Sequence, residues 1–253
     1  AATMVPCPWF PDVAALCRAN PGVDMGVHLT LTCEYQAYRW GPISTRDPAS
    51  GLLAEDGLFP HDPHELQSQA LPGPAARELR AQVDRARAAG IDVTHLDTHQ
   101  LTVYAPEILA AYTGLAVQDR LPLMLLRLGV AGWQSLGRAI GLPLEPETAG
   151  LLAAAAEELE AQGVPLVDHA FMMPLDRPDD RVDLAKWALA NLAPGLTHFV
   201  LHPAVDSPEL RAITTDWPSR VADCQAFSSR ALCDHVRQSG VQVIGYRALR
   251  DLL

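Results

Sequence analysis

The stretch that decides the fold is PAARELRAQVDRARAAGIDVTHLDTH, residues 74–99. Pro74 and Gly90 are typical of the start and the end of a helix, and the apolar residues between them repeat at the spacing of one buried helix face. Residues 93–96, which follow, form a short segment that contains apolar and β-branched residues, as expected of a buried strand. The stretch therefore predicts a helix that leads directly into a strand.

The same alternation continues along the chain in both directions. A second helix is bounded by Pro146 and Gly163, and Gly240 closes the last one. We predict strands near residues 3–5, 25–31, 93–96, 123–126, 165–167, 198–201 and 241–244. Strands that alternate with helices in this way predict an α/β fold built around parallel strands.

Residues 33–73 interrupt the alternation. This segment is rich in Pro, Gly, Asp and His and shows no sustained periodicity, so it predicts a long loop with one short helix. Loops of this length in compact domains are usually functional, and a role in covering the substrate is expected here. No internal repeat or low-complexity linker divides the chain, so we predict a single domain over residues 1–253.

Composition excludes several classes of function. The 253 residues are 49% hydrophobic and carry a formal net charge of -11, with no cluster of Lys and Arg. Such a chain repels nucleic acid and anionic membranes, and a neutral or weakly charged substrate is favoured. No apolar run reaches the roughly 20 residues that cross a bilayer, and the first residues lack a signal peptide's basic and apolar regions. We therefore expect a cytoplasmic enzyme.

The cysteines do not indicate a disulfide framework or a structural zinc cluster. They are odd in number, widely spaced and without a CxxC pair. We expect them to be reduced thiols, most of them buried as small hydrophobic residues. They are Cys7, Cys17, Cys33, Cys224 and Cys233.

Histidines lie near the ends of three predicted strands. His28 lies in GVHLTLT, His95 opens the five-residue stretch HLDTH, and His202 lies in VLHP. In parallel α/β folds ligands gather at the carboxyl ends of the strands, where side chains from several strands converge. Asp97 and His99 alternate with Leu96 and Thr98, so in extended backbone they project to the same side as His95. Imidazole and carboxylate together suit Zn²⁺ or a similar divalent ion.

Each histidine also has a structural alternative. A lone strand histidine such as His28 is more often a hydrogen-bonded structural residue, and His202 before Pro203 fits that role equally well. The arrangement of His95, Asp97 and His99 is different, because three titratable residues on one face of an apolar strand are unfavourable to bury without partners. For the remaining histidines a structural role is preferred, and these are His61, His64, His198 and His235.

Arg127 follows the apolar run at 123–126, and Asp168 follows the run at 164–167, so both lie just past a predicted strand. Arg127 could hold a carboxylate, orient a substrate oxygen or pair with Asp168. Other chemistries have no support. There is no Gly-x-Ser-x-Gly elbow for a nucleophilic serine, and neither nucleotide-binding glycine motif is present.

Four stretches resemble the YdjC-type carbohydrate deacetylases, a family that includes chitooligosaccharide deacetylases and relatives associated with hopanoid biosynthesis. GVHLTLT at 26–32 resembles the family's GxHLTLT segment, and THLDTH at 94–99 resembles its THxDxHHH segment. LHP at 201–203 is similar to the CHPG turn, and YRAL at 246–249 is similar to the closing YREL. WPSR at 217–220 also lies where the family has an Arg before a long helix.

The resemblance implies a (β/α)-barrel-like fold of seven strands or an incomplete barrel, usually a homodimer. It implies removal of acetyl groups from N-acetylated mono- or oligosaccharides with a divalent metal ion, Mg²⁺ or Zn²⁺. The family holds the metal with one Asp and two His, and the two histidines correspond to His28 and His95. His202 corresponds to the late histidine expected to act as general acid, and Asp97 and His99 correspond to further site residues.

The chain departs from the family pattern in two places. The family begins with a strand that ends in Asp-Asp-Phe-Gly and supplies the Asp ligand and a catalytic base, and no stretch of this chain matches it. Residues 1–5 resemble the family's second strand instead, so we expect the first strand and helix to be absent from this sequence. The family's histidine-rich continuation is replaced here by Gln100-Leu101-Thr102.

These observations predict metal-assisted amide hydrolysis. His28 and His95 would bind the metal, His202 would be the acid, Asp97 an orienting or basic carboxylate, and His99 and Arg127 would contact the substrate. The main alternative is a catalytically impaired carbohydrate- or metabolite-binding barrel, which the unmatched Asp segment favours. A second alternative is a different metal-dependent hydrolase of C–N or ester bonds, since ligands define chemistry better than substrate.

Overall fold

The computed structural model describes residues 1–253, which form two compact units. The first unit consists of Ala1–Glu34, Arg39–Leu166 and Gly245–Leu253, and the second of Tyr35–Tyr38 and Val167–Ile244. None of the helices combines the length and the apolar character that a bilayer-spanning helix needs.

The first unit is built around a parallel sheet. Its strands β1 (Ala2–Thr3), β2 (Met25–Leu29) and β3 (Val93–Thr98) lie side by side in chain order. Leu123 extends the sheet through a parallel bridge to Leu96, whose carbonyl accepts a hydrogen bond of 2.8 Å from the amide of Met124. The predicted α/β fold with parallel strands is confirmed, and so are strands in the regions 25–31 and 93–96, whereas β1 overlaps the predicted strand at 3–5 only at Thr3.

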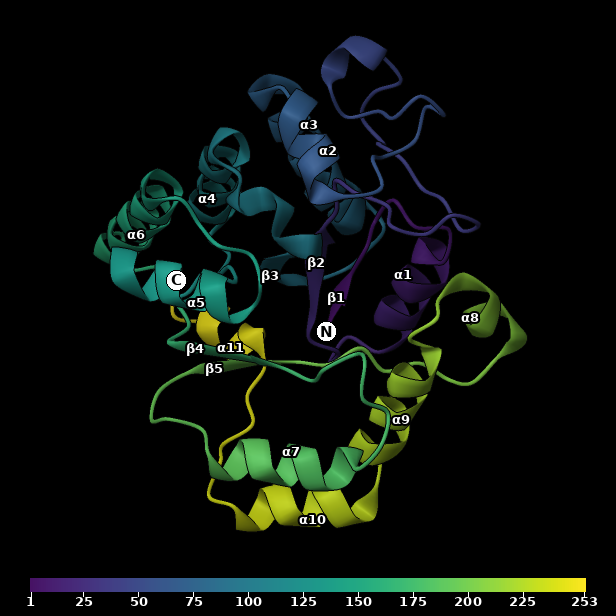
Figure 1. Ribbon diagram of the computed structural model, residues 1–253, viewed down its shortest axis with the longest axis vertical. Helices are drawn as coiled ribbons and strands as arrows, with labels where there is room; N and C mark the ends of the chain where they lie inside the picture. The colour runs from purple at the N-terminus through teal and green to yellow at the C-terminus, as the bar shows by residue number, and fades with distance from the viewer. The chain divides into compact units, whose positions relative to one another are not determined.

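Helices pack around this sheet, and their ends follow the predicted punctuation. Gly90 and Gly163 adopt left-handed backbone conformations with φ of 84° and 79°, which glycine adopts without a Cβ clash, just beyond two of the helices. Figure 1 shows α3 alongside α4. The long helices of the unit are α1 (Phe10–Ala19), α3 (Pro72–Ala88), α4 (Pro106–Asp119), α5 (Val130–Ala139) and α6 (Pro146–Ala161).

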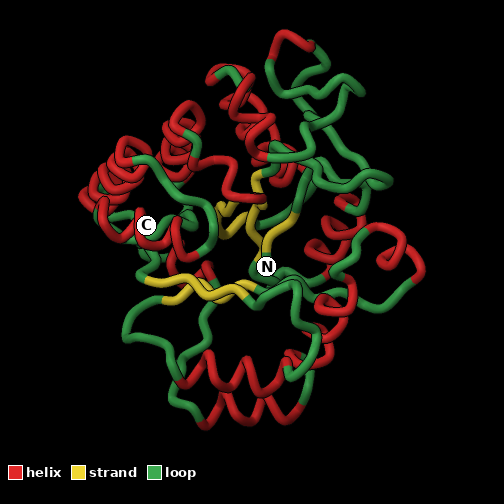
Figure 2. Tube along the Cα trace, in the orientation of Figure 1, coloured by secondary structure: helices red, strands yellow, loops and turns green.

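The segment 33–73 is mostly loop, as predicted, with one 3-10 turn, η1 (Pro48–Ser50), and one short helix, α2 (Pro63–Gln69) (Figure 2). Internal hydrogen bonds order it. Arg39 donates to the carbonyls of Cys33 and Phe59 at 2.7 and 2.9 Å. The fully buried carboxylate of Glu78 on α3 accepts from the amides at 43 and 44. Because its backbone groups have fixed partners, this long loop holds a defined conformation.

The last helix of the chain, α11 (Tyr246–Arg250), docks onto the start of β3. Arg247 and Arg250 both bind the carboxylate of Asp92, with Arg250 Nη1 at 2.5 Å from Oδ1. Arg250 also donates to the carbonyl of Val93 at 3.0 Å. Charge-assisted hydrogen bonds of this kind are among the stronger ones in proteins, so Asp92 holds the C-terminus of the chain against the sheet.

Acid should release α11. The hydrogen bond from Arg250 is the main influence on the pKa of Asp92, and with Arg247 it holds this pKa below the ordinary value of 3.8 against the effect of burial. A carboxyl whose folded pKa is lowered contributes stability that is present above its unfolded pKa and lost as pH falls through the folded pKa. We expect lower amide protection factors, which correct for the pH dependence of intrinsic exchange, in α11 below about pH 4. Asp92→Asn should give the low protection already at neutral pH, whereas Glu55→Gln, an exposed loop change, should not.

The second unit contains a two-stranded parallel sheet, β4 (His169–Met172) with β5 (Thr197–Val200), visible in Figure 2 as the two neighbouring yellow strands that run across the picture. Met173, Ala185 and Leu232 form its buried core, covered by Phe171 and Phe199 among others. Figure 1 shows α7 and α10 side by side. The helices of this unit are α7 (Arg181–Ala190), α8 (Pro208–Ile213), α9 (Trp217–Phe227) and α10 (Arg230–Gln238).

Three predicted strands differ from the structure. The strand expected at 123–126 is reduced to isolated bridge residues, one of them Leu123. The strand expected at 165–167 begins later, at His169, where the backbone pairs with Thr197. The strand expected at 241–244 is absent, and these residues have no regular secondary structure. Val243 and Ile244 there are 76% and 51% exposed, so they lack the half-buried surface that favours β-branched residues in a strand.

Candidate active site on β2 and β3

His28 and Asp97 face each other across neighbouring strands. The register of β2 and β3 pairs these two residues directly, and Nδ1 of His28 donates to Oδ1 of Asp97 at 2.7 Å. The side chains are 26% and 13% exposed, so the pair lies near the surface but is shielded from bulk water. The bond fixes the imidazole ring and leaves Nε2 as the ring nitrogen that can accept a proton or bind an ion.

The surroundings of His28 favour its protonated form. Burial has the largest influence on the His28 pKa and lowers it, but the charge and the hydrogen bond of Asp97, with a smaller contribution from Glu34, outweigh burial. The net effect raises the pKa of His28 above its ordinary value of 6.5. His28 is therefore more basic than an isolated histidine.

His99 completes this group. Its ring lies edge-on to His28 with a centroid distance of 5.5 Å, and Nε2 is 2.8 Å from Oε2 of Glu34. Trp40, from the long loop, lies edge-on to His99 at 6.3 Å. The structure therefore brings together three of the predicted site residues, His28, Asp97 and His99. Glu34 was not predicted, because it lies in an irregular segment with no periodicity to place its side chain.

The backbone directly after His99 is strained. Gln100 and Leu101 have φ values of 52° and 56°, in the left-handed region that residues other than glycine seldom adopt. The side-chain oxygen of Gln100 accepts a hydrogen bond of 2.7 Å from the hydroxyl of Thr32, in the segment that follows β2. Strain of this kind is found preferentially at functional sites, which supports a site at this end of β3.

His95 has different neighbours. Its side chain is only 3% exposed, and its ring stacks on that of Tyr246 in α11, with centroids 4.0 Å apart and planes 14° apart. Nδ1 is 3.0 Å from the hydroxyl of Thr94. The ring also covers Gly26 in β2 so closely that a Cβ atom at this glycine would lie 2.5 Å from the ring. His95 is thus held firmly, and Gly26 is required for its placement.

Gly26→Ala should displace His95. The added methyl group would overlap the imidazole, and overpacking of a core typically costs about 1–3 kcal/mol. We expect a loss of this size in the free energy of unfolding by urea, together with a changed His95 environment in NMR spectra. Gly22→Ala is the matched control, because no atom lies within 4 Å of the Cβ it would add. Equal stability of the two variants would contradict the close approach of Gly26 and His95.

His202 lies just after β5 in the second unit, on a buried ion pair. Its amide donates to Oδ2 of Asp223 at 3.3 Å, and Oδ1 of Asp223 lies 2.9 Å from Nη2 of Arg181. Both charged side chains are almost completely buried. Burial raises the pKa of Asp223, against the opposing effects of the His202 amide and Arg181. The backbone at His202 is therefore anchored by a charged group inside the protein.

Arg127 lies on the surface of the first unit. Its guanidinium is 3.2 Å from the carboxylate of Glu160 on α6, and both side chains are about half exposed. Asp168 in the second unit accepts a hydrogen bond of 2.8 Å from the amide of Leu196. The predicted role of Arg127 in substrate binding stays a prediction.

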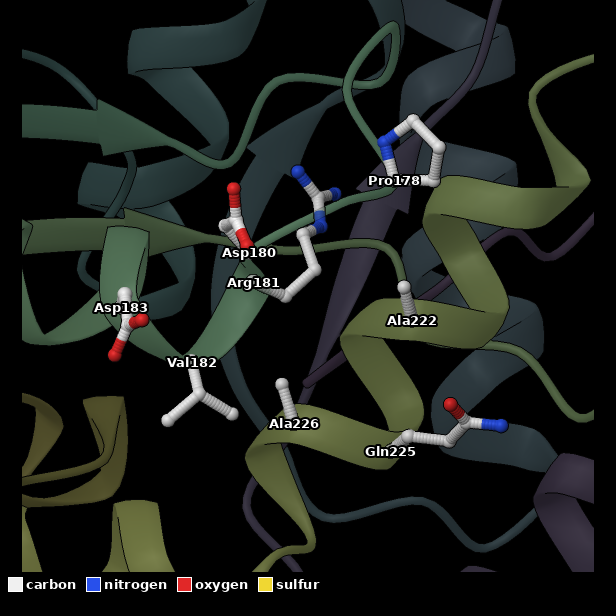
Figure 3. A pocket seen from close by; sticks show the side chains of 8 residues that line it. All are labelled: Pro178, Asp180, Arg181, Val182, Asp183, Ala222, Gln225 and Ala226. Carbon is white, nitrogen blue, oxygen red and sulfur yellow. The ribbon is translucent and has the colours of Figure 1, made fainter.

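Two open hollows lie elsewhere. One, of about 340 Å³, is formed by α1 and the end of α3. The other, of about 310 Å³, lies between the start of α7 and α9, and Figure 3 shows its lining residues, among them Asp180, Arg181 and Asp183. None of the predicted site residues lines either hollow.

The ligand set expected for a metal ion is not complete among these side chains. No group of three or more His, Cys, Asp or Glu side chains is arranged to hold an ion. The arrangement does supply a basic imidazole with a carboxylate partner beside a second histidine and a second carboxylate. Such groups can take up and deliver protons, and the Nε2 atom of His28 can bind an ion.

Comparison with known protein families matches residues 1–238 to the family described as YdjC-like protein. A carbohydrate deacetylase of Thermus thermophilus is 35% identical over 225 residues, which cover 89% of this chain and 75% of that protein. A carbohydrate deacetylase of Brevibacillus brevis is 35% identical over 48% of the chain and 46% of its own length. A third, from Thermoanaerobacter pseudethanolicus, is 21% identical over 94% of the chain and 82% of its length.

A solved structure has the same fold. It comes from Enterococcus faecalis and is described as a cellobiose-phosphate cleavage protein. It superposes with a TM-score of 0.73 at 20% identity and covers 98% of this chain and 86% of its own. At this level of identity the likeness concerns the fold alone.

Proposed function

The chain belongs to the YdjC-like protein family, and on that premise we propose that it is a hydrolase that removes acetyl groups from N-acetylated sugars. Relatives named carbohydrate deacetylase, one of them aligned over 89% of the chain, support this proposal. The observation that carries it is the hydrogen-bonded pair of His28 and Asp97 on parallel strands, with His99 beside it.

The donor chemistry of His28 fits a divalent metal ion such as Zn²⁺ or Mg²⁺. Histidine ligands of metals commonly donate their other ring N–H to a carboxylate, as His28 donates to Asp97. We propose His28 and His95 as ligands, with at least one further ligand needed to complete the set. When bound, the ion would polarise the acetyl carbonyl and lower the pKa of a water molecule.

The chain's own residues would orient groups and move protons. Asp97 holds the ring of His28 and keeps the proton on Nδ1. We assign His202 the transfer of a proton to the departing sugar amine, with its backbone fixed by Asp223. His99 and Arg127 would contact the sugar, His99 through the polar group that it forms with Glu34. The same proposal includes a (β/α)-barrel fold. It also includes a homodimer, and light scattering would measure this oligomeric state.

The test is acetate release. The full chain, incubated with N-acetylglucosamine oligomers and either Zn²⁺ or Mg²⁺, should release acetate in proportion to enzyme, and elemental analysis should find bound metal. If no acetylated sugar releases acetate but simple amides or esters are hydrolysed, the deacetylase proposal is wrong and the alternative hydrolase is supported.

A second candidate is a carbohydrate-binding protein without turnover. The incomplete group of metal-ligating side chains favours it. Calorimetry with the same oligomers separates the two candidates, because a carbohydrate-binding protein without turnover would bind the sugar and release no acetate.

A further inference from the structure

Thr94 connects His95 to a carboxylate. The Thr94 hydroxyl lies 2.5 Å from Oδ1 of Asp24 and 3.0 Å from Nδ1 of His95. Asp24 is 3.9 Å from that nitrogen, which is too far for a direct hydrogen bond. Thr94 is completely buried, so water does not compete for its hydroxyl group.

The hydrogen count then fixes the direction of both bonds. A hydroxyl group has one hydrogen to donate, and an ionised carboxylate can only accept. Both carboxylate oxygens of Asp24 act as acceptors here, Oδ1 for the Thr94 hydroxyl and Oδ2 for the Arg247 amide. Thr94 therefore donates to Asp24 and must accept from Nδ1 of His95.

The end of the chain holds this group in place. The amide of Arg247 donates to Oδ2 of Asp24 at 2.7 Å, so Asp24 is bound from two sides. Tyr246, the preceding residue, stacks on the His95 ring. The imidazole thus has both a fixed plane and a fixed hydrogen-bond partner.

We propose that Thr94 and Asp24 are positioning residues that hold His95 as the tautomer with its proton on Nδ1 and its lone pair on Nε2. This places the basic nitrogen of His95 in the same chemical state as that of His28, whose Nδ1 donates directly to Asp97. The functional meaning, that Nε2 is the atom presented to a divalent ion, rests on the proposed function. The tautomer itself rests only on the hydrogen bonds.

Nitrogen NMR of the imidazole rings tests the tautomer without metal or substrate. At a pH about two units above the ordinary histidine pKa, long-range ¹H–¹⁵N spectra should show a protonated Nδ1 and an unprotonated Nε2 for His95. Thr94→Val removes the acceptor at nearly constant volume and should give a mixture of tautomers, whereas Thr94→Ser should keep the original one. Thr113→Val, which removes a hydroxyl bonded to helix carbonyls, controls for general loss of a hydrogen bond. A protonated Nε2 in the native protein, or an unchanged tautomer in Thr94→Val, would overturn the proposal.

Titration with Zn²⁺ separates this inference from the proposed function. If both hold, Thr94→Val should weaken Zn²⁺ binding by roughly 10- to 100-fold, and Thr94→Ser should bind nearly as the native chain does. A native chain that shows the expected tautomer but binds no Zn²⁺ would support the positioning role and contradict the metal site. Equal Zn²⁺ affinity of the native chain and Thr94→Val would overturn the role of Thr94 in presenting His95.

Discussion

Asp223→Ala is expected to lower the free energy of unfolding by about 3–5 kcal/mol, because it leaves the Arg181 guanidinium charged and without its carboxylate inside the protein. Arg181 would retain hydrogen bonds to backbone carbonyls, including that of Pro174, but these do not neutralise its charge. A loss of this size is a large part of the total stability of an ordinary domain. The amide of His202 would lose its acceptor at the same time. Urea denaturation followed by circular dichroism measures the change.

A second ion pair of the same unit is the control. Arg211 and Asp206 make a shorter contact, 2.7 Å against 2.9 Å, but both side chains are about half exposed to water. Asp206→Ala should therefore change stability much less than Asp223→Ala does. Similar losses of unfolding free energy in the two alanine variants would show that burial does not increase the contribution of the Arg181–Asp223 pair to stability.

His28→Ala should reduce acetate release by more than about 100-fold. Replacing a residue that only supports a metal ligand typically lowers metal affinity or activity by about 10–100-fold, and His28 is the proposed ligand itself. Asp97→Asn, which keeps the shape but removes the charge bound to Nδ1, should fall within that 10–100-fold range. The kinetic parameters kcat and KM, with bound metal measured on the same samples, give the effects of both substitutions.

His64→Ala is the matched control for His28. His64 lies exposed at the start of α2, and its side chain takes no part in the site. This variant should keep native activity and metal content. Native activity in His28→Ala would remove the pair of His28 and Asp97 from the reaction and leave the proposed mechanism without its central group.

Much of the fold follows from local signals in the sequence. Helices such as α3 and α6 begin at or near proline and end just before a glycine, and these residues act through the backbone geometry of one or two positions. Strands need partners that are distant in the chain. The β-branched segment at 241–244 has the composition of a strand but no regular structure, because composition does not supply a neighbouring backbone to pair with.

The site could be predicted in part for the same reason. Alternation in extended backbone predicted that His95, Asp97 and His99 project to one side. Asp97 and His99 both lie against His28, whereas His95 has Tyr246 and Thr94 as neighbours. The partner Glu34 and the positioning residues Thr94 and Asp24 were not predicted. Their roles depend on a loop conformation and on hydrogen-bond directions, which sequence spacing does not determine. Which histidines bind metal stays a prediction.

The stacking of Tyr246 on His95 has a consequence for synthesis of the protein. The first unit is discontinuous, and its piece Gly245–Leu253 is translated long after the residues that form β1, β2 and β3. A ribosome-bound chain can form the parallel strands early, but until residues 246 and 247 emerge His95 lacks its aromatic neighbour and Asp24 lacks the amide of Arg247. A chain that stops before these residues therefore leaves His95 without its stacking partner.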